Sequence, residues 1–378
     1  MTNKMKRYYL LLLIYVLLLV LIGGVISTRA QVIRVANNNS NAPTGDNIFA
    51  TAQEAIDAAN TGDIVQIAPS DTNYGDIIID KSITLYGIGY NPDKDSPFLS
   101  RVDDIDVTGS AASGTSIIGV RANQISLSVD TGSPYTQSNI TIKSSRVNRI
   151  HQNTSNQLND LQIINCWISA GTGTQTIVLA TDDKISNALI ANNIIDGYSG
   201  GAFGWGAVNA GNFTIIRNNL FIGPNNVNYS FAFHKIEDCI ISNNVFYGRS
   251  PRHGTSGTSE NNIFSNNLSY GQNPALPPPS TGTGDNTGSG NLENTDPKFV
   301  GVVLGGGWQL SYDPTYEGDS PAIGAGTDDN DLGILGGDQP FTNYTTGSVL
   351  PVIQELDISG LVNQGENLEI TITAKSTN

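Results

Sequence analysis

Cysteine is nearly absent from this sequence of 378 residues, where it occurs only as Cys166 and Cys239. The two cysteines fall in structural repeats that are three apart, so at about 4.8 Å per repeat they are separated by roughly 14 Å. That distance is too long for a disulfide bond. We expect both to be small apolar fillers of the core, which excludes a redox pair or a cysteine metal site.

Charged residues are also scarce, at 14% of the chain, and their balance is acidic, with 34 acidic against 19 basic residues. Residues 1–30 contain four of the basic residues and no acidic one, so the remainder carries 15 − 34 = −19. Such a surface repels polyanions, which excludes nucleic acid as a partner. It also disfavours a polyuronate substrate unless cations bridge the two. Gly, Ser, Thr and Asn are abundant instead, as many turns between short strands require.

The N-terminus carries a long apolar run. Lys4, Lys6 and Arg7 precede the uncharged residues 8–26, and small residues up to Ala30 follow. This order is typical of a secretory signal peptide cleaved after residue 30. The run of 19 residues also reaches the length of a membrane-spanning helix, so an uncleaved N-terminal membrane anchor is the alternative. Both interpretations predict an extracellular or cell-surface protein, which contacts the membrane only through residues 8–26 if they are retained.

An Asn-Asn pair inside a short apolar run returns at nearly constant spacing. Full pairs begin at Asn192, Asn218, Asn243 and Asn266, and a weaker copy without the second Asn begins at Asn165. The steps between them are 27, 26, 25 and 23 residues. A period this short and this variable indicates a solenoid whose rungs are short strands joined by loops, because helical repeats usually need about 33 residues or more.

Each repeat predicts the same arrangement around its first Asn. The residues two places before and two places after that Asn are apolar, and we expect both to face the interior because alternate residues of a strand point the same way. The Asn itself is expected at a sharp corner with positive φ, which Asn tolerates better than other non-glycine residues. We further expect these side chains to stack as an amide ladder made of Asn165, Asn192, Asn218, Asn243 and Asn266.

Segments outside the repeats are expected to cap the solenoid or to extend from it. Residues 31–62 predict a strand and a capping helix that begins with a capping box at Thr51. The solenoid would span residues 63–340, with the Pro- and Gly-rich stretch 274–291 as a projecting loop. Residues 341–378 contain two alternating apolar runs and predict a C-terminal β-hairpin.

Three stretches resemble the right-handed parallel β-helix proteins of the pectin-lyase-like superfamily. They are residues 49–67, the Asn-Asn repeats, and the closing segment with Asp296-Pro297, Ser320-Pro321-Ala322-Ile323 and Asp331-Leu332-Gly333. The resemblance covers residues 47–337 and implies an all-β fold, a right-handed parallel β-helix. It does not imply one activity, because this superfamily includes lyases, hydrolases, esterases, epimerases and proteins with no known reaction. The polygalacturonase-type catalytic set is missing, since Asn294-Thr295-Asp296 lacks its partner motifs.

The best candidate for a sugar contact is a face with Trp205 and His234 on successive repeats, and with Lys235 and Asp238 nearby. An aromatic platform beside hydrogen-bonding side chains is how a polysaccharide is held. The alternative is that Trp205 fills the core and that His234 is a turn residue.

The sequence assigns no cofactor and no catalytic residue. A calcium-dependent lyase would need clustered carboxylates and a basic side chain that removes a proton. The acidic pairs at residues 182–183 and 237–238 are about two rungs, or roughly 10 Å, apart and cannot share one ion. The acidic residues 328, 329 and 331 are the remaining calcium candidate, but they lack the full loop spacing and are expected to form a solvated turn.

These observations favour an exported, non-catalytic β-helix protein that binds glycans or builds part of a cell-surface structure. The solenoid repeat and the missing catalytic sets support this interpretation. The alternative is a polysaccharide lyase or glycoside hydrolase that acts on an extracellular polysaccharide through a site of unfamiliar form.

Overall fold

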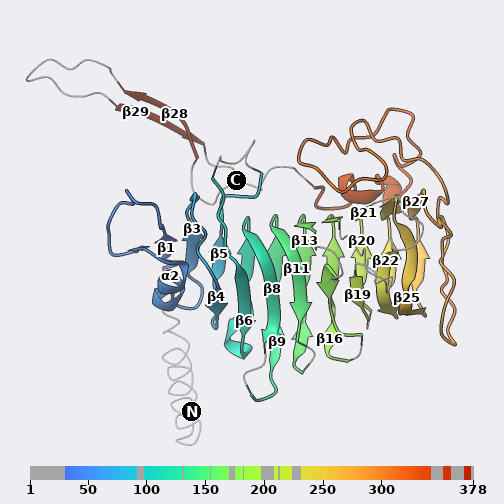
Figure 1. Ribbon diagram of the computed structural model, residues 1–378, viewed down its shortest axis with the longest axis horizontal. Coiled ribbons are helices and arrows are strands. Elements are labelled where there is room, and N and C mark those ends of the chain that lie inside the picture. The colour runs from blue at the N-terminus through green and yellow to red at the C-terminus, as the bar shows by residue number, and fades with distance from the viewer. Residues whose placement is uncertain are drawn as a thin grey trace, which may run out of the picture. The chain divides into compact units, whose positions relative to one another are not determined.

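The computed structural model describes residues 30–91, 98–129, 132–153, 155–169, 175–181, 183–196, 208–211, 213–223, 231–341, 352–358 and 370–375. Within these ranges the chain forms a parallel β-solenoid with little helix, as the repeats predicted (Figure 1). None of the helices in these ranges has the length and apolar character needed to cross a membrane. The predicted signal or anchor segment, residues 8–26, lies outside the described residues.

Parallel sheets form the walls of the solenoid. In the described part of the chain, the first sheet has 11 strands, in the order β2 (Ile48–Phe49), β1 (Ile33–Ala36), β3 (Ile64–Ile67), β5 (Thr84–Tyr86), β7 (Ser116–Ile118), β10 (Thr141–Lys143), β13 (Gln162–Ile164), β17 (Leu189–Ala191), β20 (Ile215–Arg217), β23 (Ile240–Ser242) and β26 (Ile263–Ser265). A small sheet contains β9 (Thr136–Ser138), β12 (Gln157–Asn159) and β16 (Ile185–Ser186).

The second large sheet bends into two faces. It comprises β4 (Ile77–Ile79), β6 (Asp104–Thr108), β8 (Arg121–Val129), β11 (Arg146–Gln152), β14 (Trp167–Ile168), β15 (Ile177–Val178), β18 (Ile194–Ile195), β19 (Val208–Ala210), β21 (Leu220–Ile222), β22 (Phe231–Glu237), β24 (Val245–Tyr247), β25 (Ser250–Glu260) and β27 (Leu268–Tyr270). β11 turns the bend, because its first residues pair with β14 and its later residues pair with β15. Each later rung therefore contributes a separate strand to each face.

The strand register in the first sheet reproduces the repeat seen in the sequence. Gln162 pairs with Leu189, and the same column continues through Ile215, Ile240 and Ile263. The apolar residues two places before each first Asn are fully buried in the interior, as predicted: Ile163, Ile190, Ile216, Ile241 and Phe264. Because equivalent residues stack on every rung, the apolar core is continuous along the solenoid.

The first Asn of each repeat forms a corner with positive φ, as predicted. The φ angles are 54° at Asn165, 54° at Asn192, 54° at Asn218, 57° at Asn243 and 53° at Asn266. The corner reverses the side to which alternate residues point, so the prediction that the residues two places after each Asn face inward is wrong. These residues pack in a second apolar cluster outside the interior: Trp167, Ile194, Leu220, Val245 and Leu268.

An amide ladder joins the rungs, but the second Asn of each pair makes it. Asn193 Nδ2 donates to Asn219 Oδ1 at 3.0 Å, and Asn219 Nδ2 donates to Asn244 Oδ1 at 3.0 Å. The ladder continues through Asn267 to Asn291. The predicted ladder of first asparagines is therefore one residue out of place, because the corner points the first side chain outward and the second inward.

The first asparagines instead hold a C-terminal segment, residues 297–341, which we call the strap. Asn192 Nδ2 donates to Gly336 O at 2.7 Å, and Asn243 Oδ1 accepts from Thr327 N at 3.1 Å. Apolar strap side chains complete the second apolar cluster: Phe299, Val302, Trp308, Ala322, Leu332, Ile334 and Phe341. The strap therefore covers the outward residues of the later rungs.

Helix α2 (Ala52–Ala58) has the predicted capping box. Thr51 Oγ1 accepts from Glu54 N, and the Glu54 carboxylate accepts from Thr51 N. Its small apolar stripe, including Ile56, is buried with the first strands in the interior core, as a cap requires.

The other end of the stack differs from the prediction. The stretch 274–291 is not a projecting loop, since Leu276 is buried in the interior core and Thr287 forms a parallel bridge with Ile263. Asn262 Nδ2 also donates to Asn286 Oδ1 at 2.9 Å. The proline and glycine content predicted a loop. Thr287 and Asn286 nevertheless stack on Ile263 and Asn262 of the preceding rung, so this stretch forms a final, irregular rung.

Two further predictions are confirmed. β28 (Val352–Ile358) and β29 (Ile370–Lys375) pair as antiparallel strands, as the C-terminal hairpin required. Cys166 and Cys239 are free and buried, and burial raises the pKa of each thiol to about 12. Neither thiol is therefore ionised at neutral pH, in keeping with a filling role.

Candidate functional site

One outward face of the solenoid carries the candidate site. It is formed by the strand segments that follow the corner on each rung, and we call it the corner face. The strand pairing aligns a first outward column of Arg101, Arg121, Arg146, Trp167, Ile194, Leu220, Val245 and Leu268. A second column lies two residues further along each rung, at Asp103, Asn123, Asn148, Ser169, Asp196, Ile222, Tyr247 and Tyr270.

Three arginines occupy successive rungs at the start of this face. Arg101 and Arg121 are joined by a parallel bridge, and Arg121 pairs in register with Arg146. All three are half-buried. None forms an ion pair with a carboxylate of the residues that the structure describes. Arg101 Nη2 donates to the backbone oxygen of Asp71 at 2.6 Å, so its orientation is set by a neutral partner.

The arginines perturb one another. Burial lowers the pKa of Arg121, and the charge of Arg101 lowers it further. Burial also lowers the pKa of Arg146, with a further decrease from Arg121 and an opposing influence of Tyr90 and Asp196. The Arg146 guanidinium carbon lies 3.8 Å from the ring centre of Trp167, a cation–π contact on the next rung. Arg146 therefore has an aromatic partner, whereas Arg101 and Arg121 are like charges on adjacent rungs.

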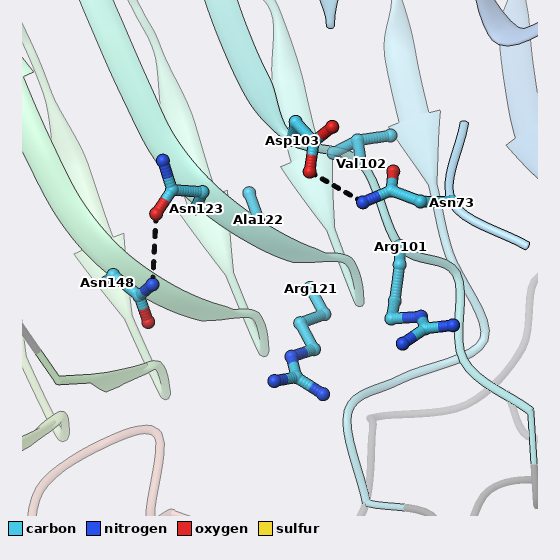
Figure 2. A pocket seen from close by; sticks show the side chains of 8 residues that line it. All are labelled: Asn73, Arg101, Val102, Asp103, Arg121, Ala122, Asn123 and Asn148. Atoms are coloured by element: carbon cyan, nitrogen blue, oxygen red, sulfur yellow. Dashed lines mark hydrogen bonds between the residues drawn. The ribbon is translucent and has the colours of Figure 1, made fainter. Parts of the chain in front are cut away.

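Beside the arginines lies a surface hollow of about 170 Å³ (Figure 2). Its lining includes Arg101, Arg121 and a row of exposed polar side chains. Asn73 Nδ2 donates to Asp103 Oδ1 at 2.6 Å, and Asn148 Nδ2 donates to Asn123 Oδ1 at 3.1 Å. Figure 2 shows Asp103 and the two arginine side chains pointing in different directions within this lining. The hollow therefore offers guanidinium donors in one part and amide and carboxylate groups in another.

The predicted sugar contacts are not brought into this hollow. Trp205 lies outside the described residues. His234 and Lys235 are half-buried on β22, which is separated from β11 by β15 and β19. Burial lowers the pKa of His234, and the charges of Lys235 and His253 lower it further. Asp238 is an exposed corner residue with a φ of 53°.

The acidic candidates for calcium are also dispersed. Among the described residues, no group of three or more His, Cys, Asp or Glu side chains is placed to hold a metal ion. Asp331 Oδ1 accepts from Gly324 N at 3.0 Å within the strap, and Asp182 lies outside the described residues. Asp331 thus supplies a local hydrogen bond within the strap.

A second group of polar residues is buried under the strap. Asp196 Oδ2 accepts from Trp308 N at 2.8 Å. Burial raises the pKa of Asp196 to about 6, against a lowering influence of that hydrogen bond and of the Arg249 charge. Arg249 is only 1% exposed, and its Nη1 donates to Phe231 O at 3.2 Å. This group ties the strap to the solenoid and is closed to solvent.

The sequence contained a signal for the arginine column that our sequence reasoning missed. The tripeptides Arg101-Val102-Asp103, Arg121-Ala122-Asn123 and Arg146-Val147-Asn148 share an Arg, apolar, Asp or Asn pattern on three consecutive rungs. The three arginines are 20 and 25 residues apart and precede the first Asn-Asn pair of the repeats. Because no Asn pair marks the corners of these rungs, the sequence alone could not align them, and the strand register was needed. In comparisons with known proteins, this sequence matches no protein-family model and no curated protein.

Proposed function

We propose that this chain is an exported protein that binds a polysaccharide and does not cleave it. The polysaccharide lies on the part of the corner face that the strap leaves uncovered, where the hollow is. One observation carries the proposal: hydrogen-bonding side chains repeat on consecutive rungs, as Arg101 with Asp103, Arg121 with Asn123 and Arg146 with Asn148. A polymer of repeated units can make equivalent contacts with a surface that itself repeats. The hydroxyl groups of a saccharide suit the donors and acceptors of guanidinium, amide and carboxylate groups.

The proposal includes a location in the extracellular space or at the cell surface. Residues 1–30, as a signal peptide or membrane anchor, would direct the solenoid to the extracellular space or the cell surface. The sequence resemblance to right-handed β-helix proteins of the pectin-lyase-like superfamily supports a role with extracellular polysaccharides. A purely structural role at the cell surface is compatible with the same fold, but it does not account for the polar columns of the hollow.

Cleavage of the polysaccharide is the second candidate function. It is favoured by the lowered pKa of Arg121, a basic side chain that lines the hollow. A guanidinium nevertheless keeps its proton at neutral pH, which makes it a better binding group than a base. Binding without cleavage is therefore the primary proposal.

Affinity electrophoresis of the full chain in gels that contain neutral or acidic polysaccharides, with and without calcium, tests the proposal. We expect retardation by at least one polysaccharide and no new reducing ends or ultraviolet-absorbing unsaturated products. The double variant Asn123→Ala with Asn148→Ala should lose most of the retardation. Gln162→Ala is the matched control, because Gln162 is an exposed amide on β13 in the other large sheet. New reducing ends or unsaturated products would show that the chain cleaves the polysaccharide, and the second candidate function would then stand. Migration without retardation in every gel would refute both functions.

A further inference from the structure

The arginine column presents an electrostatic problem that no carboxylate of the described residues relieves. The chain carries a net charge of −15, with 34 acidic residues to choose from. Yet Arg101 and Arg121 lie on adjacent rungs and form no ion pair with any described carboxylate. Half-buried like charges on neighbouring strands repel one another, and this repulsion is screened less than on an open surface. An external anion would remove the repulsion.

The two guanidinium groups favour an anion whose oxygen atoms accept hydrogen bonds. A guanidinium group is planar and presents its N–H groups as a fork that matches carboxylate, sulfate and phosphate oxygens. Arg121 faces the hollow, and no hydrogen bond of its side chain to another described residue competes for that fork. Arg101 is held at one nitrogen by Asp71 O, which leaves its other N–H groups for a ligand.

The neighbouring groups limit where the anion can sit. Asp103 lines the same hollow, but its Oδ1 is occupied by Asn73 Nδ2 at 2.6 Å. Figure 2 shows Asp103 on the opposite side of the hollow from the guanidinium group of Arg121. On the other side of Arg121, Arg146 stacks on Trp167. Among the described residues, Arg101 and Arg121 are therefore the arginines of this column with neither a carboxylate nor an aromatic ring as partner.

We propose that Arg101 and Arg121 form a site for an oxyanion, a sulfate or carboxylate group carried by the bound polysaccharide. This inference rests on the proposed function, and it narrows the ligand from polysaccharides in general to acidic ones. It revises the expectation that the acidic balance of the chain disfavours a polyuronate, because the arginines gather positive charge locally on adjacent rungs. The row of Asn123 and Asn148 contacts hydroxyl groups of the same polymer, while the two arginines, on rungs about 4.8 Å apart, together hold one of its acidic groups.

A matched series of polymers tests this inference. Dextran, carboxymethyl dextran and dextran sulfate share one backbone and differ in the acidic group, and their binding to the full chain is measured by isothermal titration calorimetry. We expect at least one acidic dextran to bind at least tenfold more tightly than dextran. The two acidic polymers separate carboxylate from sulfate as the preferred group.

Three variants separate the site from general charge effects. Arg121→Gln should weaken binding of the acidic polymer about ten- to hundredfold, as expected for loss of a charge-assisted hydrogen bond. Combining it with Arg101→Gln should lower the affinity for the acidic polymer to that for dextran. Arg252→Gln removes the same charge from β25 and should leave the affinity unchanged. Thermal melting of each variant shows that it folds. Equal affinities of the Arg121→Gln and unaltered chains, or no preference for acidic dextrans, would overturn the inference.

Two results distinguish an error in the oxyanion site from an error in the proposed polysaccharide binding. Retardation by a neutral polysaccharide that depends on Asn123 but not on Arg121 would keep the function and reject the oxyanion site. A second probe is sodium sulfate at the ionic strength of a sodium chloride control. If sulfate raises the melting temperature of the unaltered chain but not of Arg121→Gln, and no polysaccharide binds, the oxyanion site stands and polysaccharide binding is rejected.

Discussion

The two halves of the corner face share one backbone arrangement but present opposite chemistry. In the first half the outward columns are arginine and Asp or Asn, which are half-buried or exposed. In the second half, from Ile194 onward, the same columns are mostly aliphatic or Tyr and lie under the strap. Asp196 is the exception, and it is buried there with a strap hydrogen bond. We call these the open half and the covered half.

The comparison shows that a rung position does not by itself decide whether its side chain is core or surface. Ile194 and Arg146 occupy the same outward column, yet Ile194 is fully buried because residues 297–341 cover it. The covered half therefore adds a second apolar core outside the first. The open half keeps its side chains available to solvent and to a ligand.

The inner side of the corner differs between the halves as well. In the covered half, Asn219 Oδ1 accepts from the backbone N and Nδ2 of Asn193, while its own Nδ2 donates to Ile190 O at 2.8 Å. In the open half, Ser145 Oγ accepts from Val120 N at 3.2 Å. The backbone N–H at the buried side of the corner therefore has a hydrogen-bond partner in both halves, as buried backbone donors require. The partner is an amide oxygen in the covered half and a hydroxyl oxygen in the open half.

The largest expected effect is on the covered half. Ending the chain at residue 295 removes the strap and exposes the apolar columns beneath it. We expect the free energy of unfolding to fall by about 5 kcal/mol or more, because several buried apolar side chains lose their contacts. Urea unfolding and binding of an apolar fluorescent dye measure this. A chain that ends at residue 341 keeps the strap and serves as the control. Equal unfolding midpoints for the two chains would contradict a second core.

The next effect compares two asparagines. Asn219→Ala in the buried ladder should destabilise the chain by roughly 3 kcal/mol, since it leaves buried groups of Asn193 and Ile190 without partners. Asn123→Ala in the open half should change stability by less than about 0.5 kcal/mol, because its side chain is exposed. Urea unfolding of both variants checks this difference. Similar losses in the two would show that the ladder does not depend on burial.

A pH effect should be specific to the covered half. Burial raises the pKa of Asp196 from 3.8 to about 6 in the folded chain. Between these values the folded chain binds more protons than the unfolded chain, so this group makes stability fall as pH rises from about 4 to 6. Asp196→Asn keeps an acceptor for Trp308 N and should remove this fall, with a gain on the order of 2 kcal/mol above pH 6. Unfolding of both chains at pH 4, 5, 6 and 7 measures it. Parallel pH profiles would exclude a buried titrating Asp196.

The smallest effect is expected in the open half. Without ligand, Arg121→Gln should leave the free energy of unfolding within about 0.5 kcal/mol, or raise it slightly, because it relieves repulsion from Arg101. Thermal melting at low and high salt measures this, and any gain should shrink as salt screens the charges. A loss above about 1 kcal/mol would mean that Arg121 has a structural role that outweighs its repulsion.

Much of the fold was predictable because it depends on local sequence. The capping box at Thr51, the positive φ of Asn192 and the inward position of Ile190 each follow from residues within a few positions of one another. The candidate site was not predicted, because it depends on which residues of different rungs align. Rungs of unequal length hide that alignment wherever no Asn pair marks the corner.

By itself, the sequence determined the repeat, the interior column and the corner conformation, since short-range sterics and alternation control all three. Only the tertiary structure decided that the corner turns Asn192 outward and Asn193 inward, and that the strap covers Ile194 but leaves Arg121 open. The outward position of Asn192 and the cover over Ile194 depend on contacts with the strap, more than a hundred residues away, and Asn193 is held by Asn219, 26 residues away. The physical reason is that burial is a property of what packs against a residue, and no local pattern contains its distant partner.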